Sequence, residues 1–203
     1  MKLPSLFRPS SPEQFLGPSQ ALAHGLARLA AAARASEDAP LRVLLLGPPG
    51  TGKTTLATWF ARSLGATQAW NWFDCRPVNG KDVDLAFVCA CAQSWSLRSF
   101  IPGYRILQIE EVDRMTPDAQ VRFLTLADQM PKASAIIATS NKALELFEER
   151  FQRRFKVLHT SAVPDGEIRQ LLVELGSPPP RPRRLPRCAA ATWAPPSRMP
   201  ISP

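Results

Sequence analysis

The eight residues GPPGTGKT at positions 47–54 constrain the fold of this chain more than any other stretch. They follow LRVLLLG (41–47), a continuous apolar run that predicts a buried parallel strand. They lead into KTTLATWFARSLG (53–65), which has the spacing of an amphipathic helix. A glycine-rich turn that joins a strand to a helix and closes with Gly-Lys-Thr is typical of a phosphate-binding loop. The sequence therefore predicts a nucleotide site where this strand ends.

The residue types in this loop each suit the binding of phosphate. Gly50 and Gly52 let the backbone curl so that its N–H groups point at phosphate oxygens, and the start of the helix adds its positive dipole end. Lys53 is expected to meet the β- and γ-phosphates, and Thr54 to offer a hydroxyl to Mg²⁺. The predicted nucleotide-binding residues are Gly47, Pro48, Pro49, Gly50, Thr51, Gly52, Lys53, Thr54 and Thr55. The alternative, a Gly-Pro turn that matches the pattern by chance, is disfavoured by the flanking elements.

A second stretch, ILQIEEVD (106–113), runs from an apolar strand into adjacent acids. A phosphate loop needs a carboxylate at the end of a neighbouring strand to hold Mg²⁺, which predicts Glu110 as the metal ligand. A second carboxylate must polarise the attacking water, and Glu111 fits that role. A glutamate side chain is one methylene longer than that of aspartate, the residue more usual at this position. Because Mg²⁺ keeps several of its waters, their rearrangement can accommodate the longer side chain. We therefore expect ATP hydrolysis; the alternative is that these acids only cap an exposed turn.

Strands and helices are predicted to alternate along most of the chain. The expected strands are 41–47, 67–74, 104–111, 134–141 and 156–160, and the expected helices are 19–35, 53–65, 116–130, 142–155 and 164–176. Thr116 is the expected N-cap of its helix, with Pro117 at the first helical position. The segment 82–98 suits a helix or a strand equally. This alternation predicts an α/β fold with a parallel sheet flanked by helices.

The composition indicates the expected cellular location of the chain and the kind of partner that suits it. The chain has 203 residues, 45% of them hydrophobic, and a net charge of +8 that suits an acidic partner such as nucleic acid. No secretory signal or membrane-length apolar run is seen, so we expect a cytoplasmic location with reduced cysteines and no membrane partner. Cys89-x-Cys91 could be half of a metal site, but without a second close pair it is more consistent with small buried side chains. Trp59, Trp70 and Trp72 are expected to pack in the core.

These motifs together resemble the AAA+ ATPases, and within them the clamp loaders. GPPGTGKTT is the typical sequence of their phosphate loop. EEVDRMTPDAQ (110–120) is similar to the clamp-loader pattern and departs from it at Glu110, where the family has aspartate. SLFRPSSPEQFLGPSQAL (5–22) is similar to the arm that lies over the adenine. IIATSN (136–141) and FEERFQRRFKVL (147–158) are similar to the segments that carry the polar sensor and the arginine finger.

The resemblance implies further site residues, cofactors and partners. Asn141 would help to hold the attacking water, and Arg154 would act as an arginine finger on the nucleotide of a neighbouring subunit, with Arg150 as the alternative. ATP and Mg²⁺ are the implied cofactors. Other AAA+ subunits, DNA and a sliding clamp are the candidate partners. Without the resemblance, Arg150, Arg153 and Arg154 would be solvated arginines on a charged helix, and Asn141 an Asx-turn residue.

The domain organisation departs from the family. We expect an arm (1–17), a nucleotide-binding domain (18–160), the start of a helical lid (161–176) and a disordered Pro/Arg-rich tail (177–203). The family's lid has several helices, so this lid is predicted to be truncated unless a partner completes it. Three functions remain open: a DNA-remodelling ATPase of clamp-loader or replication type, a protein-remodelling AAA+ chaperone, and a nucleotide-binding scaffold that does not hydrolyse ATP.

Overall fold

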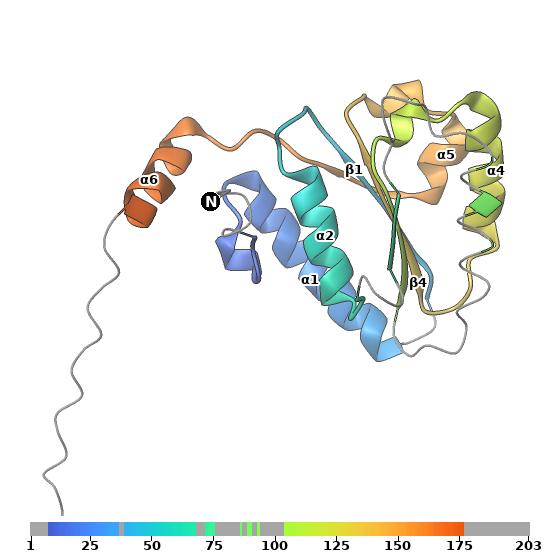
Figure 1. Ribbon diagram of the computed structural model, residues 1–203, viewed down its shortest axis with the longest axis horizontal. Coiled ribbons are helices and arrows are strands. Elements are labelled where there is room, and N and C mark those ends of the chain that lie inside the picture. The colour runs from blue at the N-terminus through green and yellow to red at the C-terminus, as the bar shows by residue number, and fades with distance from the viewer. Residues whose placement is uncertain are drawn as a thin grey trace, which may run out of the picture.

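The computed structural model describes residues 8–36, 39–67, 72–75, 86, 89–90, 93 and 104–176. A five-stranded parallel sheet in the order β2-β3-β4-β1-β5 forms its centre. The strands are β1 (Leu41–Leu46), β2 (Trp72–Cys75), β3 (Arg105–Ile109), β4 (Ser134–Ser140) and β5 (Lys156–His159). The α-helices of the described residues include α1 (Pro18–Ser36), α2 (Lys53–Ser63), α4 (Pro117–Asp128), α5 (Glu149–Arg154) and α6 (Asp165–Gly176). The predicted α/β fold is confirmed (Figure 1).

The sheet is covered by helices on both faces, with α1 and α2 on one side and α4 and α5 on the other (Figure 1). Alternate residues of a strand point to opposite faces. In β1, Val43 and Leu45 therefore pack beneath α1 and α2, whereas Leu44 and Leu46 pack beneath α4 and α5. Burial on both faces explains why β1 reads as a continuous apolar run rather than an alternating one.

The start of α4 follows the predicted capping pattern. The Thr116 hydroxyl accepts a hydrogen bond from the Ala119 N–H at 3.3 Å, and Pro117 occupies the first turn. Since the first N–H groups of a helix have no partner within the helix, this local bond determines where α4 begins. The predicted N-terminus of this helix is confirmed.

The predicted helix 142–155 is wrong. The segment instead forms a 3-10 turn at Leu144–Leu146 and the short helix α5, separated by extended backbone at Phe147 and Glu148. The side chain of Gln152 closes the break, because its Nε2 donates to the Leu144 and Phe147 carbonyl oxygens at 3.1 and 2.9 Å. The break also lets Phe147 stack on Phe151, with ring centroids 5.0 Å apart, inside the core under α4 and α5.

Other local predictions have mixed outcomes. β2 begins at Trp72, later than the predicted start at residue 67, and of 82–98 the four described positions are helical. Cys89 is exposed rather than buried, so its predicted role as a small core side chain is wrong. Trp59 and Trp72 are buried as predicted. Cys91, Trp70 and the tail 177–203 lie outside the described residues.

The N-terminal arm packs against the helical layer and reaches α6. Phe15 is buried and meets Trp59 of α2 edge-on, with ring centroids 5.5 Å apart. The Gly17 N–H donates to Glu167 Oε2 of α6 at 2.7 Å. Otherwise α6 lies away from the sheet (Figure 1), with Leu172 and Val173 exposed. Within the described ranges, no helix has both the length and the apolar character needed to cross a membrane.

Candidate nucleotide site

The loop between β1 and α2 is held to the end of β5 by hydrogen bonds. Thr160 donates to the Leu46 carbonyl oxygen through its N–H at 2.7 Å and its hydroxyl at 3.0 Å. The Thr51 and Thr160 hydroxyl oxygens are 2.8 Å apart. Gly50 and Gly52 both adopt φ of 81°, in the left-handed region that glycine favours. The loop is thus a folded structure whose turns require the glycines of the motif.

Gly47 lies so close to Thr160 that no side chain fits. A Cβ atom at Gly47 would lie 2.3 Å from the Thr160 carbonyl oxygen. Gly47→Ala should therefore lower the free energy of unfolding by about 1–3 kcal/mol, the usual cost of overpacking, measured by chemical denaturation. Gly25→Ala is the matched control, because a Cβ there meets nothing within 4 Å. As Gly25 is inside α1, the control should raise stability by about 1 kcal/mol; equal effects of the two changes would contradict the close approach.

Lys53, the first residue of α2, folds back over the loop. Its Nζ donates to the Gly47 and Pro48 carbonyl oxygens, each at 2.7 Å, and the residue is only 7% exposed. Burial lowers the pKa of Lys53, and the negative charges of Asp113 and Glu111 oppose that shift. The first turn of α2 carries no acidic residue. The loop therefore combines a cation with a helix N-terminus, which suits an anionic ligand.

The acids of the β3 end lie beside this loop. All strands are parallel, so β1 and β3 both end at the same edge of the sheet, here named the carboxyl edge. Glu110 is half-buried, and Gln108 Nε2 donates to its Oε1 at 3.4 Å. Two hard oxygen donors, the Glu110 carboxylate and the Thr54 hydroxyl, are of the type that Mg²⁺ prefers. In the described part of the chain no cluster of three or more His, Cys, Asp or Glu could hold a metal by itself. A magnesium ion here would thus need phosphate oxygens and water as well.

Glu111 has an unusual backbone conformation, with φ of 55° and ψ of 49°. This left-handed geometry costs a non-glycine residue about 1–2 kcal/mol. Three hydrogen bonds hold Glu111. Its N–H donates to Thr139 Oγ1 at 3.2 Å, its carbonyl oxygen accepts from the Arg114 N–H at 2.9 Å, and Arg114 Nη1 donates to its Oε2 at 3.3 Å. The Glu111 side chain is still 41% exposed, so it can accept a hydrogen bond from water.

Asn141 follows β4, and the structure brings it to the same edge. It lines a pocket of about 360 Å³ together with Gly47 and Pro48 of the loop. Its N–H donates to Asp113 Oδ1 at 3.2 Å, which links the end of β4 to the turn after β3. Asp113 had no predicted role, although it is the third acid of the quoted stretch ILQIEEVD. Its charge also acts on Lys53.

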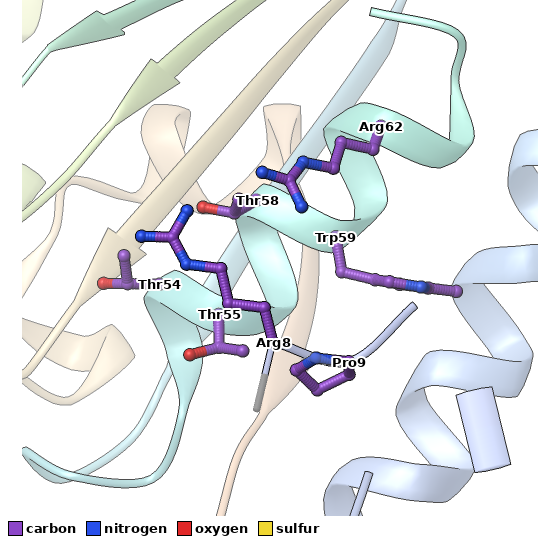
Figure 2. A pocket seen from close by; sticks show the side chains of 7 residues that line it. All are labelled: Arg8, Pro9, Thr54, Thr55, Thr58, Trp59 and Arg62. Carbon is purple, nitrogen blue, oxygen red and sulfur yellow. The ribbon is translucent and has the colours of Figure 1, made fainter. Parts of the chain in front are cut away.

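A second pocket, of about 280 Å³, lies against α2 next to the loop (Figure 2). The arm and α2 line it with Arg8, Pro9, Thr54, Thr55, Thr58, Trp59 and Arg62. Figure 2 shows the Arg8 and Arg62 guanidinium groups on the same side of α2 as the Thr58 hydroxyl. Among the residues that the structure describes, no acid lines this pocket, and its two arginines add positive charge next to the loop. Only the four-residue spacing of Thr54, Thr58 and Arg62 could have indicated it from the sequence.

Arg154 lies at the opposite edge of the sheet. β5 pairs in parallel with β1, with Lys156 beside Val43 near the start of β1. Arg154, just before β5, is therefore at the amino edge, away from the phosphate loop of its own chain. Its guanidinium binds Asp128 at the end of α4, whereas Arg153 pairs with Glu149 and Arg150 is exposed.

The profile of the AAA family, described as "ATPase family associated with various cellular activities", matches residues 43–161, more than half of the chain. The chain belongs to the AAA family. The predicted resemblance is thereby confirmed at the level of the AAA family. The match includes the phosphate loop, the β3 acids, Asn141 and Arg154.

Curated relatives of this AAA chain include two branch migration proteins. The Holliday junction branch migration complex subunit RuvB of Methanoregula boonei is 32% identical over 146 residues, which are 71% of this chain and 39% of that relative. RuvB of Chlorobium phaeovibrioides is 33% identical over 120 residues, or 58% of this chain and 30% of that relative. The chain thus spans less than half the length of these relatives.

Solved structures share the fold. The RuvB Holliday junction branch migration motor of Thermotoga maritima superposes with a TM-score of 0.63 at 24% identity, over 82% of this chain and 52% of that one. A DNA polymerase III gamma subunit-related protein of the same organism gives 0.61 at 14% identity, over 73% and 49%. At these identities the likeness concerns the fold alone.

Proposed function

We propose that this AAA chain binds and hydrolyses ATP as one subunit of an oligomeric assembly that remodels DNA. The observation that carries the proposal is the carboxyl edge of the sheet. There a folded glycine loop, the buried cation of Lys53 and the exposed carboxylate of Glu111 lie close enough for their charges to interact. A phosphate group, its cation and a base for water are the components that phosphoryl transfer to water requires.

In this proposal the loop residues 47–55 bind the phosphates. Backbone N–H groups and Lys53 contact the phosphate oxygens, and Thr54 and Glu110 hold Mg²⁺. When bound, Mg²⁺ neutralises phosphate charge. Glu111 accepts a proton from the attacking water, and Asn141 orients that water from the end of β4. Arg154 cannot serve its own loop across the sheet, so its proposed partner is the nucleotide of a neighbouring subunit.

DNA is the proposed substrate of the assembly. The net charge of +8 favours a polyanion. The curated relatives are branch migration subunits, which favours branched DNA. A clamp-loader role is the second candidate, supported by the EEVDRMTPDAQ motif (110–120) and by the shared fold of the gamma subunit-related protein. That role would add primed DNA and a sliding clamp as partners.

Turnover of ATP with different DNA substrates tests this function. Phosphate release would be measured alone, with a four-way junction, and with primed DNA, at two salt concentrations. Stimulation by the junction supports a branch-migration role, and stimulation by primed DNA supports a clamp-loader role. DNA binding should weaken as salt rises, because phosphate contacts release counterions. ATP that binds but is never hydrolysed under any condition would instead support the scaffold function.

Lys53→Ala should abolish ATP binding, because the phosphates lose their direct cation. The measurement is titration of a fluorescent ATP analogue, with Mg²⁺ present. Lys156→Ala is the control, since it removes an exposed lysine from the start of β5, at the amino edge of the sheet and away from the loop. ATP affinity unchanged by Lys53→Ala would exclude this loop as the nucleotide site.

A further inference from the structure

Arg154 and Asp128 form a bidentate ion pair at the amino edge of the sheet. Arg154 Nε donates to Asp128 Oδ1 and Nη2 donates to Oδ2, both at 2.7 Å. Nη1 donates to the Arg150 carbonyl oxygen at 3.0 Å, one helical turn back. The hydrogen bond from Arg154 lowers the pKa of Asp128, so this residue is a carboxylate at neutral pH. Three contacts thus fix the plane of the guanidinium as well as its position.

Two hydrogens of this guanidinium are not used by these contacts. A guanidinium has five N–H groups, and the contacts with Asp128 and Arg150 use three of them. One hydrogen on Nη1 and one on Nη2 remain, at the outer end of the side chain, and no other described residue contacts them. The Arg154 side chain is 31% exposed. The side of the guanidinium formed by Nη1 and Nη2, here named its outer edge, can therefore donate to a phosphate outside this chain.

We propose that Asp128 is a positioning residue for Arg154, holding the outer edge of its guanidinium ready for the nucleotide of a neighbouring subunit. The inference rests on the proposed function, in which Arg154 acts in trans. An unrestrained arginine loses rotamer freedom when it binds phosphate, and a pre-oriented one loses less. Asp128 lies at the end of α4, and Arg42 of β1 binds the adjacent Ala127 carbonyl oxygen at 2.6 and 2.9 Å. The positioning group is thus itself held to the sheet.

A role in stability alone predicts a different outcome. Asp128 is 47% exposed, and ion pairs this exposed contribute little to folding. Asp128→Asn removes the charge and one of the two acceptors while it keeps the shape. We expect unchanged melting temperature and ATP affinity, but turnover lower by about 10- to 100-fold, as for a misplaced catalytic group. Asp128→Glu should restore part of the loss, and Glu149→Gln, which frees Arg153 on the same helix, should have no effect.

Mixed assemblies locate the defect in the neighbouring site. Subunits with Asp128→Asn have an intact Glu111, and subunits with Glu111→Gln have an intact Arg154. Each variant alone should turn over slowly, and their mixture should recover activity. Recovery is expected only if Asp128 acts through the neighbour's nucleotide; a mixture no faster than its components would overturn the proposal.

The outcomes separate this inference from the proposed function. If Arg154→Ala hydrolyses ATP normally, the trans role of Arg154 fails, and the positioning role fails with it. If Arg154→Ala is inactive but Asp128→Asn is normal, the proposed function stands and the positioning role is wrong. Faster turnover in Asp128→Asn would mean that Asp128 restrains Arg154, which also contradicts positioning.

Discussion

Replacing Glu111 with glutamine is expected to trap ATP on the protein and to cut turnover by about 10²- to 10⁴-fold, the range of a lost general base. Glutamine keeps the shape of the side chain, but its amide does not take a proton from water. ATP should still bind, because Lys53 and the loop residues 47–55 are unchanged. Phosphate release and ATP titration on the same preparation measure the two effects separately.

The fold should tolerate this change. The change removes the charge from a partly exposed ion pair with Arg114 at 3.3 Å, and pairs open to solvent contribute little to stability. Glu148→Gln is the matched control, since Glu148 is an exposed acid whose side chain forms no cap at α5. Normal turnover in Glu111→Gln would show that another group activates the water, or that these acids only cap the turn after β3.

Arg154→Ala is expected to leave ATP bound while turnover falls by about 10³- to 10⁵-fold, the contribution of an arginine finger. The reason for intact binding is topological: Arg154 precedes β5 at the amino edge, whereas the phosphate loop lies at the carboxyl edge. The loss should therefore appear in the assembled protein at saturating ATP.

Arg153→Ala is the control for Arg154→Ala, because Arg153 is its exposed neighbour and pairs with Glu149 instead. If Arg150→Ala abolishes turnover and Arg154→Ala does not, the finger is one helical turn earlier. If neither change matters, catalysis does not use an arginine from α5, and the ion pair with Asp128 is only a surface contact.

The sequence by itself determined the features that arise from neighbouring residues. The phosphate loop follows from glycines, a lysine and a threonine at fixed spacing, and the start of α4 follows from Thr116 and Pro117. The parallel sheet follows from apolar runs that alternate with amphipathic helices, because both faces of such a sheet must be covered. The sequence also indicates the acids after β3, because they end an apolar run.

Tertiary structure alone decided what depends on contacts between distant segments. The predicted helix 142–155 breaks because Gln152 and a stack of phenylalanines stabilise the turn better than a continuous helix would. The Arg8 and Arg62 side chains line one pocket only because the arm packs on α2 (Figure 2). Asp128 and Arg154 meet because α4 and α5 cover the same face of the sheet (Figure 1). Local spacing carries no information about such pairs, since their partners are brought together by the packing of whole elements against a shared core.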